Sequence, residues 1–405
     1  MSRRNVIAGA VIAAAAAGAA ALIGMGGAPN ADPIKIGHYG SMTGAEATFG
    51  QSTDNGIILA VEEINAKGGL NGRKIELITY DTKGDSGEAG KAVTRLITSD
   101  KVTAVLGEVA STLSLAGGAV CQQYKVPMIT PSSTNLRVTM GRDYVFRVCF
   151  MDDFQTWALA KFTMETLKFD KVAILYDQKQ SYSKGLRDEF TKAFGKIGGR
   201  IVADQAYSGG DNDFSAQLSN IREAGAQIMF VSGYYSDGAA IAIQARKLGI
   251  SIPLLGGDGW DSEQLGKIGG DAIIGSYYSN HSAPDQPEMV DFVKKYKAKY
   301  KGQTPDALSG LGYDAMNILF AAMQKAKTLS GQDVRDEIAA TKGFPGVTGV
   351  ITLDKNRNAT KSVVIVKLAK NGQGEIVPTF VARIEPEPST GEEPKKDSPK
   401  ADKPK

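Results

Sequence analysis

The chain has 405 residues, of which 42% are hydrophobic and 22% charged, a composition typical of a globular protein large enough for two domains. Its 47 basic and 44 acidic residues leave a formal charge of +3, which is too small to indicate a nucleic-acid partner, and no basic block is interleaved with aromatic residues. The only two histidines have no cysteine nearby, so the spacing of a zinc site is missing.

The first 31 residues have the composition of a targeting segment. Arg3 and Arg4 provide a basic start, and an Ala/Gly-rich apolar run follows without another charge until Asp32. This run approaches the length of about 20 residues that spans a membrane. Two alternatives therefore stay open, a cleaved signal peptide and an uncleaved anchor, and both predict export.

From Ile34 onward, strand-like and helix-like segments alternate with little interruption. Strands are expected over 34–39 and 75–80, with a helix to about residue 66 after the first and a helix over 87–98 after the second. Such alternation is typical of parallel sheets with right-handed crossovers.

The next unit, residues 102–135, carries hydroxyl side chains in both of its turns. A buried strand over 102–106 precedes a helix in which Ser111 and Thr112 stand where N-cap hydroxyls belong. A second strand over 127–130 ends in a turn with Ser132 and Thr134. Because ligands bind at the carboxyl edge of parallel strands, these hydroxyls could converge on one anionic group; the alternative is that they are ordinary cap and turn residues.

The alternation restarts after residue 145 and is too long for one sheet, so we expect two similar α/β lobes. Helices are expected over 153–167, 183–197, 214–224 and 236–248, and strands over 172–176, 201–207, 228–232, 252–255 and 274–278. Helices over 287–300, 308–326 and 331–341 follow, then strands over 350–353, 363–369 and 376–384. The tail from Glu385 is proline-rich and charged, and is predicted to be disordered.

Neither the cysteines nor the known catalytic motifs indicate chemistry. Cys121 and Cys149 could pair in an oxidising compartment or could be two buried free thiols. The G-x-S-x-G elbow, the G-x-x-x-x-G-K-[ST] loop and the H-E-x-x-H motif are missing, and no activated nucleophile is recognisable. We therefore expect no catalytic residue, no metal and no cofactor.

Several segments, in order, resemble the periplasmic binding proteins that supply branched-chain amino acids to ABC importers, a bilobal type I family. They are IKIGHYGSMTGAEATFGQ, VEEINAKGGLNGRKIELITYDT, VLGEVAST, VPMITPSSTN, FRVCFMDDFQ, ILYDQKQSYSKG, FVSGYYSDG and LLGGDGWDS. Each motif is weak alone, and their order and spacing over about residues 34–384 carry the resemblance.

The resemblance implies two doubly wound parallel-sheet lobes joined by a three-segment hinge that closes over a ligand. The crossovers would lie near residues 151–153, 280–282 and 353–356. The implied division is a signal peptide or anchor (1–31), the first lobe (32–151 and 281–353), the second lobe (152–280), strands of the second lobe and hinge (354–384) and the tail (385–405).

The resemblance also implies a ligand site. Ser111, Ser132 and Thr134 would hold the α-carboxylate and part of the ammonium group of an amino acid, and Tyr182 and Tyr234 would close over it. The remaining ligand-binding residues would be Asp258, Phe49, Val109, Asp152, Trp260 and Leu308. Asp258 would pair with the ammonium, where the family usually has a glutamate; its alternative role is that of a turn residue between glycines.

Phe49 and Leu308 stand where the family often has a tyrosine and a phenylalanine, so the resemblance specifies the head-group site better than the side-chain site. The surroundings of the ligand side chain would be mostly apolar and aromatic, which favours a neutral aliphatic amino acid. The implied protein is a monomeric periplasmic solute-binding protein that delivers its ligand to an ABC permease. The alternative is a ligand-sensing domain of the same fold for another amino acid or a small amide.

Overall fold

The computed structural model describes residues 32–386. The expected targeting segment and the expected disordered tail after residue 386 lie outside the described residues. Among the described helices, none is long and apolar enough to cross a membrane.

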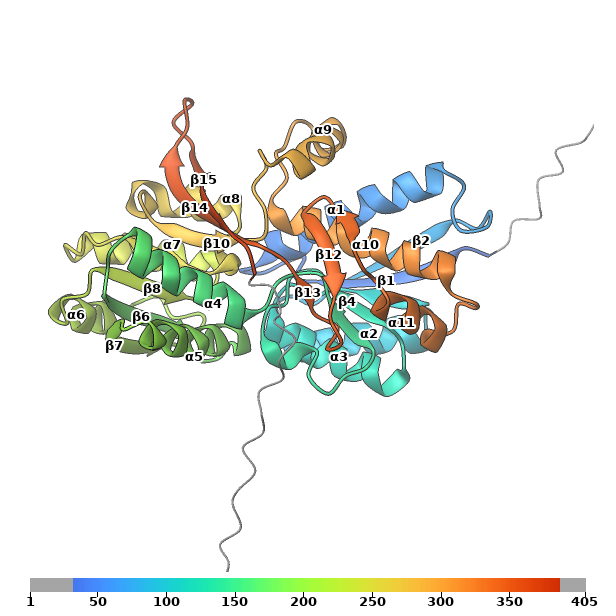
Figure 1. Cartoon of the computed structure of the whole chain (residues 1–405), viewed down its shortest axis with the longest axis horizontal. Helices are drawn as coiled ribbons and strands as arrows, with labels where there is room; N and C mark the ends of the chain where they lie inside the picture. Colours follow the sequence, from blue (N-terminus) through green and yellow to red (C-terminus); the bar gives the residue numbers. More distant parts are fainter. Residues whose placement is uncertain (1–31, 387–405) are drawn as a thin grey trace, which may run out of the picture.

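Two α/β lobes lie side by side, each built on its own sheet (Figure 1). The first sheet has the order β2-β1-β3-β4-β5, and all of its pairs are parallel. Its strands are β1 (Ile34–Gly40), β2 (Ile75–Asp81), β3 (Ala104–Leu106), β4 (Met128–Thr130) and β5 (Val145–Arg147). Its helices are α1 (Ala47–Ala66), α2 (Ser86–Thr98), α3 (Ser111–Tyr124), η1 (Leu136–Val138), α9 (Val290–Lys299), α10 (Ala307–Lys325) and α11 (Gly331–Ala339). The predicted two-lobed α/β fold is confirmed.

The second sheet has the order β15-β14-β10-β9-β8-β6-β7. Its strands are β6 (Lys171–Asp177), β7 (Arg200–Tyr207), β8 (Ile228–Ser232), β9 (Leu254–Gly256), β10 (Tyr277–Asn280), β14 (Val363–Lys370) and β15 (Ile376–Ile384). Its helices are α4 (Asp152–Lys161), η2 (Phe162–Thr166), α5 (Ser181–Lys196), α6 (Ser215–Glu223), α7 (Tyr235–Lys247), η3 (Asp258–Trp260), α8 (Glu263–Gly269) and η4 (Gly270–Ile273). The short helix η5 (Pro287–Met289) leads into α9 and belongs to the first lobe, where Met289 packs with Leu59 and Phe292. β14 and β15 join antiparallel, so this sheet is mixed.

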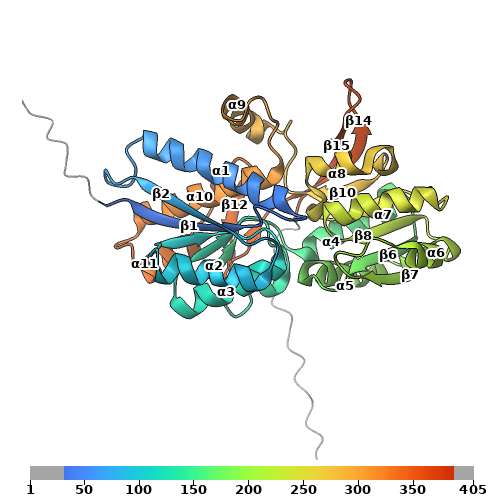
Figure 2. The ribbon, with the colours of Figure 1, turned by 180° about the vertical axis from the view of Figure 1, so that it is seen from behind.

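Helices cover both faces of each sheet because the buried strands are apolar on both sides. Figure 2 shows α1 on one face of the first sheet and α2 and α3 on the other. α10 packs along α1, and this approach is close: a Cβ at Gly56 would lie 1.9 Å from the carbonyl oxygen of Ser309. Glycine at this position therefore lets a late helix complete the core of the first lobe.

The chain passes between the sheets three times. It leaves the first sheet after β5, returns after β10, and enters the second sheet again at β14. The third crossover expected at 353–356 is placed differently: Leu353 pairs with Ala359, so this stretch turns between β12 (Gly349–Leu353) and β13 (Ala359–Thr360). Together with β11 (Phe344–Gly346) these strands form a small third sheet, and the passage follows β13.

Cys121 and Cys149 are buried free thiols, so of the two alternatives the disulfide is not formed. Burial raises the pKa of the Cys121 thiol and raises that of Cys149 to about 12. Both residues therefore act as small apolar side chains in the core.

Candidate functional site

The first lobe contributes two neighbouring turns to the site. β3 and β4 pair in parallel, with Leu106 opposite Ile129, so the turns that follow them lie at the same edge of the sheet. Ser111, Ser132 and Thr134 are all buried in these turns. Ser111 Oγ accepts a hydrogen bond of 3.2 Å from the Asn135 amide, which ties the two turns together.

The predicted N-cap role of Ser111 and Thr112 is wrong. Helix α3 begins at Ser111, its N-cap residue is Ala110, and no side chain caps it. The hydroxyls have partners on other segments instead, because the helix starts one residue earlier than the pattern indicated: Ser111 bonds Asn135, and Thr112 reaches the second lobe. The free N–H groups of the first turn therefore remain uncapped by the chain's own hydroxyls.

The second lobe contributes two tyrosines and a carboxylate. The Tyr182 and Tyr234 rings stack with centroids 5.3 Å apart and planes 7° from parallel. The Tyr182 hydroxyl donates to Asp258 Oδ1 (2.9 Å), and the Asp258 amide donates to Gln155 Oε1 (2.8 Å). This packing fixes the orientation of the Asp258 carboxylate toward the first lobe.

The two lobes meet at Asp258. The Ser132 hydroxyl lies 3.5 Å from Asp258 Oδ2, and His281 Nε2 lies 3.0 Å from both of these oxygen atoms. Phe49, from the first lobe, packs edge-on against Tyr234 with centroids 5.3 Å apart. The structure therefore brings together five of the predicted site residues, namely Phe49, Ser132, Tyr182, Tyr234 and Asp258.

Further contacts across the cleft show that the lobes are closed. Thr112 Oγ1 donates to Gln180 Oε1 (2.8 Å) and accepts from the Ser181 amide (2.9 Å). The Tyr235 hydroxyl donates to the Ala45 carbonyl (2.7 Å). Thus the N-termini of α3 and α5 face each other across the closed cleft.

The remaining predicted site residues lie in different parts of the two lobes. Thr134 and Asp152 are adjacent, since the Asp152 amide donates to the Thr134 carbonyl (3.1 Å). Val109 follows β3, and its carbonyl lies 2.9 Å from the Ser133 hydroxyl. Trp260 is wedged into the second lobe, where a Cβ at Gly256 would lie 2.2 Å from its indole ring. Leu308 is buried in the first turn of α10, and the buried Trp260 has no partner for its indole Nε1 among the described residues.

Burial sets the charge of the groups around the site. It raises the pKa of Tyr182 and of Tyr234 well above the ordinary value, with Asp258 and Glu46 adding to the respective effects, so both phenols are neutral. Burial also raises the pKa of Asp152, and the charge of Asp258 adds to this. Burial lowers the pKa of His281, so its imidazole is neutral; the carboxylate beside Nε2 identifies that nitrogen as the protonated one.

Several buried polar atoms of the site have no protein partner. They are Thr134 Oγ1, Tyr234 OH, Asp152 Oδ2, His281 Nδ1 and Ser282 Oγ. Unpaired buried polar atoms cost free energy. Because these atoms lie on both sides of the cleft, they indicate a polar ligand. Within the described residues, no cluster of three or more His, Cys, Asp or Glu side chains could hold a metal ion.

Sequence reasoning missed His281 and Gln155. In the sequence His281 is one of two isolated histidines. In the structure it follows β10 at a crossover, where the Phe150 ring stacks on it with ring centroids 3.9 Å apart. Gln155 Oε1 accepts from both the Asp258 amide and the Ser279 hydroxyl (2.6 Å). In the sequence, only its position at an expected crossover could have indicated that His281 belongs to the site. No feature of the sequence indicated Gln155.

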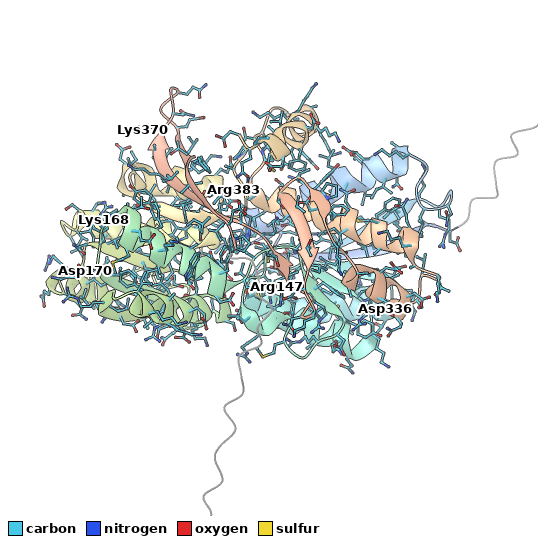
Figure 3. All side chains as sticks on the ribbon, viewed as in Figure 1. Arg147, Lys168, Asp170, Asp336, Lys370 and Arg383 are labelled. Carbon is cyan, nitrogen blue, oxygen red and sulfur yellow. The ribbon has the colours of Figure 1, made fainter. Side chains whose placement is uncertain are left out.

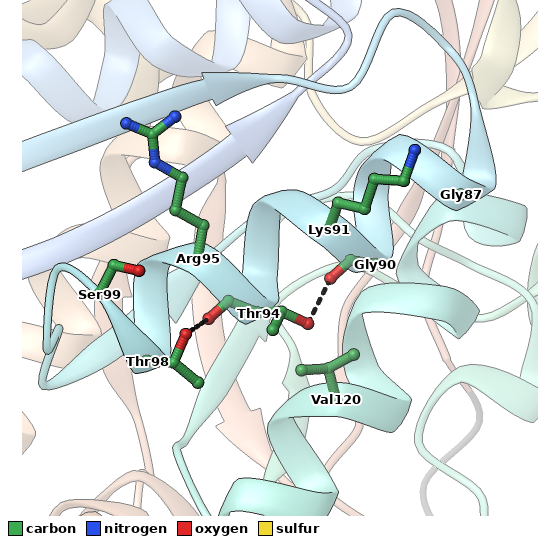
Figure 4. Close-up of a pocket in the computed structure, with 8 residues that line it drawn as sticks. All are labelled: Gly87, Gly90, Lys91, Thr94, Arg95, Thr98, Ser99 and Val120. Atoms are coloured by element: carbon green, nitrogen blue, oxygen red, sulfur yellow. Dashed lines mark hydrogen bonds between the residues drawn. The ribbon is translucent and has the colours of Figure 1, made fainter.

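A hollow of about 540 Å³ lies elsewhere, on the surface formed by α2 and α3 (Figure 4). Its Thr94 and Thr98 hydroxyls donate to carbonyls of their own helix, both at 2.8 Å, and Arg95 lies over the Tyr80 ring. None of the predicted site residues lines it. The hollow is therefore separate from the inter-lobe cleft.

Comparison with known proteins agrees with this architecture. The family model described as "Periplasmic binding protein" matches residues 33–373. A Leu/Ile/Val-binding protein homolog of Brucella melitensis is 30% identical, over 88% of this chain and 96% of the relative.

Among solved structures, a leucine binding protein LivK from Thermotoga maritima is 40% identical with a TM-score of 0.83, over 87% of this chain and 99% of that chain. The branched-chain amino acid transporter substrate binding protein LivJ from Streptococcus pneumoniae, in complex with isoleucine, is 32% identical with a TM-score of 0.80, over 86% and 99%. These matches confirm the resemblance found in the sequence, and the chain belongs to the periplasmic binding protein family.

Proposed function

We propose that the protein is an extracytoplasmic solute-binding protein that binds a neutral amino acid, branched-chain or otherwise aliphatic, between its lobes and delivers it to an ABC permease. The observation that carries this proposal is the facing pair of groups in the cleft. Hydroxyls and the α3 N-terminus lie on one lobe, and the Asp258 carboxylate lies on the other. An α-amino acid presents the complementary carboxylate and ammonium.

The first-lobe half suits a carboxylate. The uncapped N–H groups of α3 and the unpaired Thr134 hydroxyl are hydrogen-bond donors next to a favourable helix dipole. Charge-assisted hydrogen bonds of this kind contribute roughly 1.5–3 kcal/mol each.

The second-lobe half suits an ammonium group. Asp258 accepts hydrogen bonds from Ser132, Tyr182 and His281, none of which belongs to its own turn, and this favours a binding role over a turn role. A buried ammonium requires such a carboxylate because an unpaired buried charge is costly. The aromatic faces of Phe49, Tyr182 and Tyr234 support an apolar ligand side chain.

The relatives support the class of ligand. The solved structure from Streptococcus pneumoniae contains isoleucine, and a relative from Pseudomonas aeruginosa is named for binding leucine, isoleucine, valine, threonine and alanine. Membership of the periplasmic binding protein family supports a periplasmic location, and we further propose that the protein is a monomer that meets its permease at the inner membrane.

A ligand screen tests the proposal. Wild-type protein should melt at a higher temperature with leucine, isoleucine or valine than with aspartate or lysine, because a ligand that binds only the folded state stabilises it. Isothermal titration should then give a 1:1 complex, and small-angle scattering should show a smaller radius of gyration with ligand, as expected for hinge closure.

The ligand should be recovered chemically intact after incubation, and any product would instead indicate an enzyme. Stabilisation by small amides or by other amino acids alone would favour the ligand-sensing alternative. No stabilisation by any amino acid would contradict the proposal.

A further inference from the structure

Arg147, the last residue of β5, is fully buried. It lies near the middle of the molecule (Figure 3). Its Nη1 donates to the Ser133 carbonyl (2.7 Å), and its Nη2 donates to the Asn135 carbonyl (2.9 Å) and to the Thr139 hydroxyl (3.2 Å). These two carbonyls flank Thr134. The guanidinium fork therefore holds the backbone on either side of Thr134, whose buried hydroxyl has no partner among the described residues.

The charge of Arg147 has no paired anion. Within residues 32–386, no carboxylate lies within 4.0 Å of its guanidinium, and its Nε–H has no acceptor. Burial lowers its pKa, but an arginine remains protonated. Cys149, Asp152, Asp153 and Asp354 oppose this lowering of the pKa; the Cys149 thiol is neutral, and the three carboxylates make no ion pair with the guanidinium.

Such a cation is costly, since transfer of a charge from water into a protein interior must be offset by an opposite charge or by complete hydrogen bonding. A brace for the turn alone would not require a charge. An uncharged amide side chain could donate to one of these carbonyls without the cost of burying a cation.

We propose that Arg147 is a positioning residue that also acts as the remote countercharge of the ligand carboxylate. It fixes the turn from Ser132 to Asn135 through two carbonyls, and its positive charge is balanced when a carboxylate binds at Ser111 and Thr134. This inference rests on the proposed amino-acid ligand. It explains how a site without a contacting cation accepts a buried anion.

The test compares leucine with leucinol, which keeps the ammonium and the side chain but has no carboxylate. We expect Arg147→Met to weaken leucine binding on the order of tenfold or more, and to leave leucinol binding nearly unchanged. Loss of the brace alone would displace Thr134 and would also weaken leucine more than leucinol, so the pH dependence of Arg147→Lys described below separates the electrostatic role from the brace. An unchanged ratio of the two dissociation constants in Arg147→Met would overturn the proposal.

Arg246 provides a matched control in the second lobe. Its guanidinium also donates to main-chain carbonyls, those of Ile250 (2.6 Å), Ile252 (2.9 Å) and Ala272 (3.1 Å), at the strand end away from the cleft. Arg246→Met should lower the melting temperature without changing the ratio of leucine to leucinol affinity.

Arg147→Lys keeps the proposal testable if the methionine variant does not fold. A buried lysine loses its proton in an accessible range, whereas arginine does not. The preference of Arg147→Lys for leucine over leucinol should therefore fall as pH rises from 6 to 9, while that of the wild type stays constant. A constant ratio in the lysine variant would contradict the countercharge role, and a wild type that binds neither leucine nor any other amino acid would refute the proposed function itself.

Discussion

At the scale of single residues, Asp258 is the point where both lobes and a crossover meet. One oxygen of its carboxylate accepts from Tyr182, and the other lies beside Ser132 and His281. Because Tyr182 and His281 are neutral, the carboxylate is hydrogen-bonded but has no cation. A ligand ammonium would supply the missing charge.

Asp258→Asn should therefore weaken leucine binding by several kcal/mol, on the order of a thousandfold, because the buried ammonium loses its counterion. Isothermal titration measures this directly. The exposed Asp213→Asn is the control and should bind like the wild type. Near-normal affinity in Asp258→Asn, with N-acetyl-leucine binding the wild type as well as leucine, would show that Asp258 only shapes its turn.

The sequence allowed a site residue to be predicted where a neighbouring strand or helix pattern placed it at the edge of a sheet. Ser132, Tyr182 and Asp258 follow predicted strands or begin predicted helices, so the edge of the sheet on which they lie could be inferred. Arg147 could not be found in this way, since a buried arginine at a strand end has no local signature. For Trp260 and Leu308 the predicted ligand contact stays a prediction, because a buried apolar side chain beside a closed site and one in a core look alike in sequence.

At the scale of elements, the opposed N-termini of α3 and α5 form a latch between the lobes. Thr112 connects them by accepting from the Ser181 amide and donating to the Gln180 side chain. These bonds exist only while the lobes are closed, so they stabilise the closed form relative to the open one.

Thr112→Val should shift the equilibrium toward the open form and weaken leucine binding about fivefold, since a hydrogen bond contributes about 1 kcal/mol. Titration calorimetry measures the affinity, and scattering of the ligand-bound variant should show a larger radius of gyration than the wild type. The control is Thr98→Val, whose hydroxyl bonds its own helix. Equal affinity in Thr112→Val and Thr98→Val would exclude a latch role.

The elements themselves were largely predictable, because alternating strand and helix periods specify parallel sheets. The predictions were weakest where tertiary pairing decides the structure. β13 has only two residues, and its pairing with β12 turns the expected third crossover into a hairpin. No short-range sequence pattern predicts the pairing of so short a strand.

At the scale of the whole molecule, closure brings acidic groups of the two lobes near each other. Burial, with Asp237, Glu108 and Asp177 adding to it, raises the pKa of Glu46 to about 7. Burial raises that of Asp237 to about 6, with Asp177 and Asp211 adding and the Tyr207 hydroxyl opposing. Glu46 precedes α1 in the first lobe, and Asp237 lies on α7 in the second.

Opening separates Glu46 from Asp237 and Asp177 of the second lobe and returns the pKa of Glu46 toward the ordinary range, whereas the groups that shift the pKa of Asp237 all belong to its own lobe. The closed form therefore binds more protons at Glu46, and its advantage is complete below about pH 4 and is lost as pH rises through about 7. The dissociation constant for leucine should increase several-fold between pH 5 and pH 8. Titrations across this range should show a flatter profile for Glu46→Gln, whereas the exposed Glu223→Gln should keep the wild-type slope; identical profiles in all three would contradict the linkage.

The packing of α10 along α1 also has a consequence for how the chain folds. The Tyr313 hydroxyl donates to Glu63 across 250 residues of sequence, and the second lobe is inserted between these two partners. Contacts this distant in sequence form late, since a long loop must close before they can contribute. The first lobe therefore has no complete core until α10 has been synthesised, and a nascent chain that ends before α10 should leave exposed the side of α1 that packs on α10.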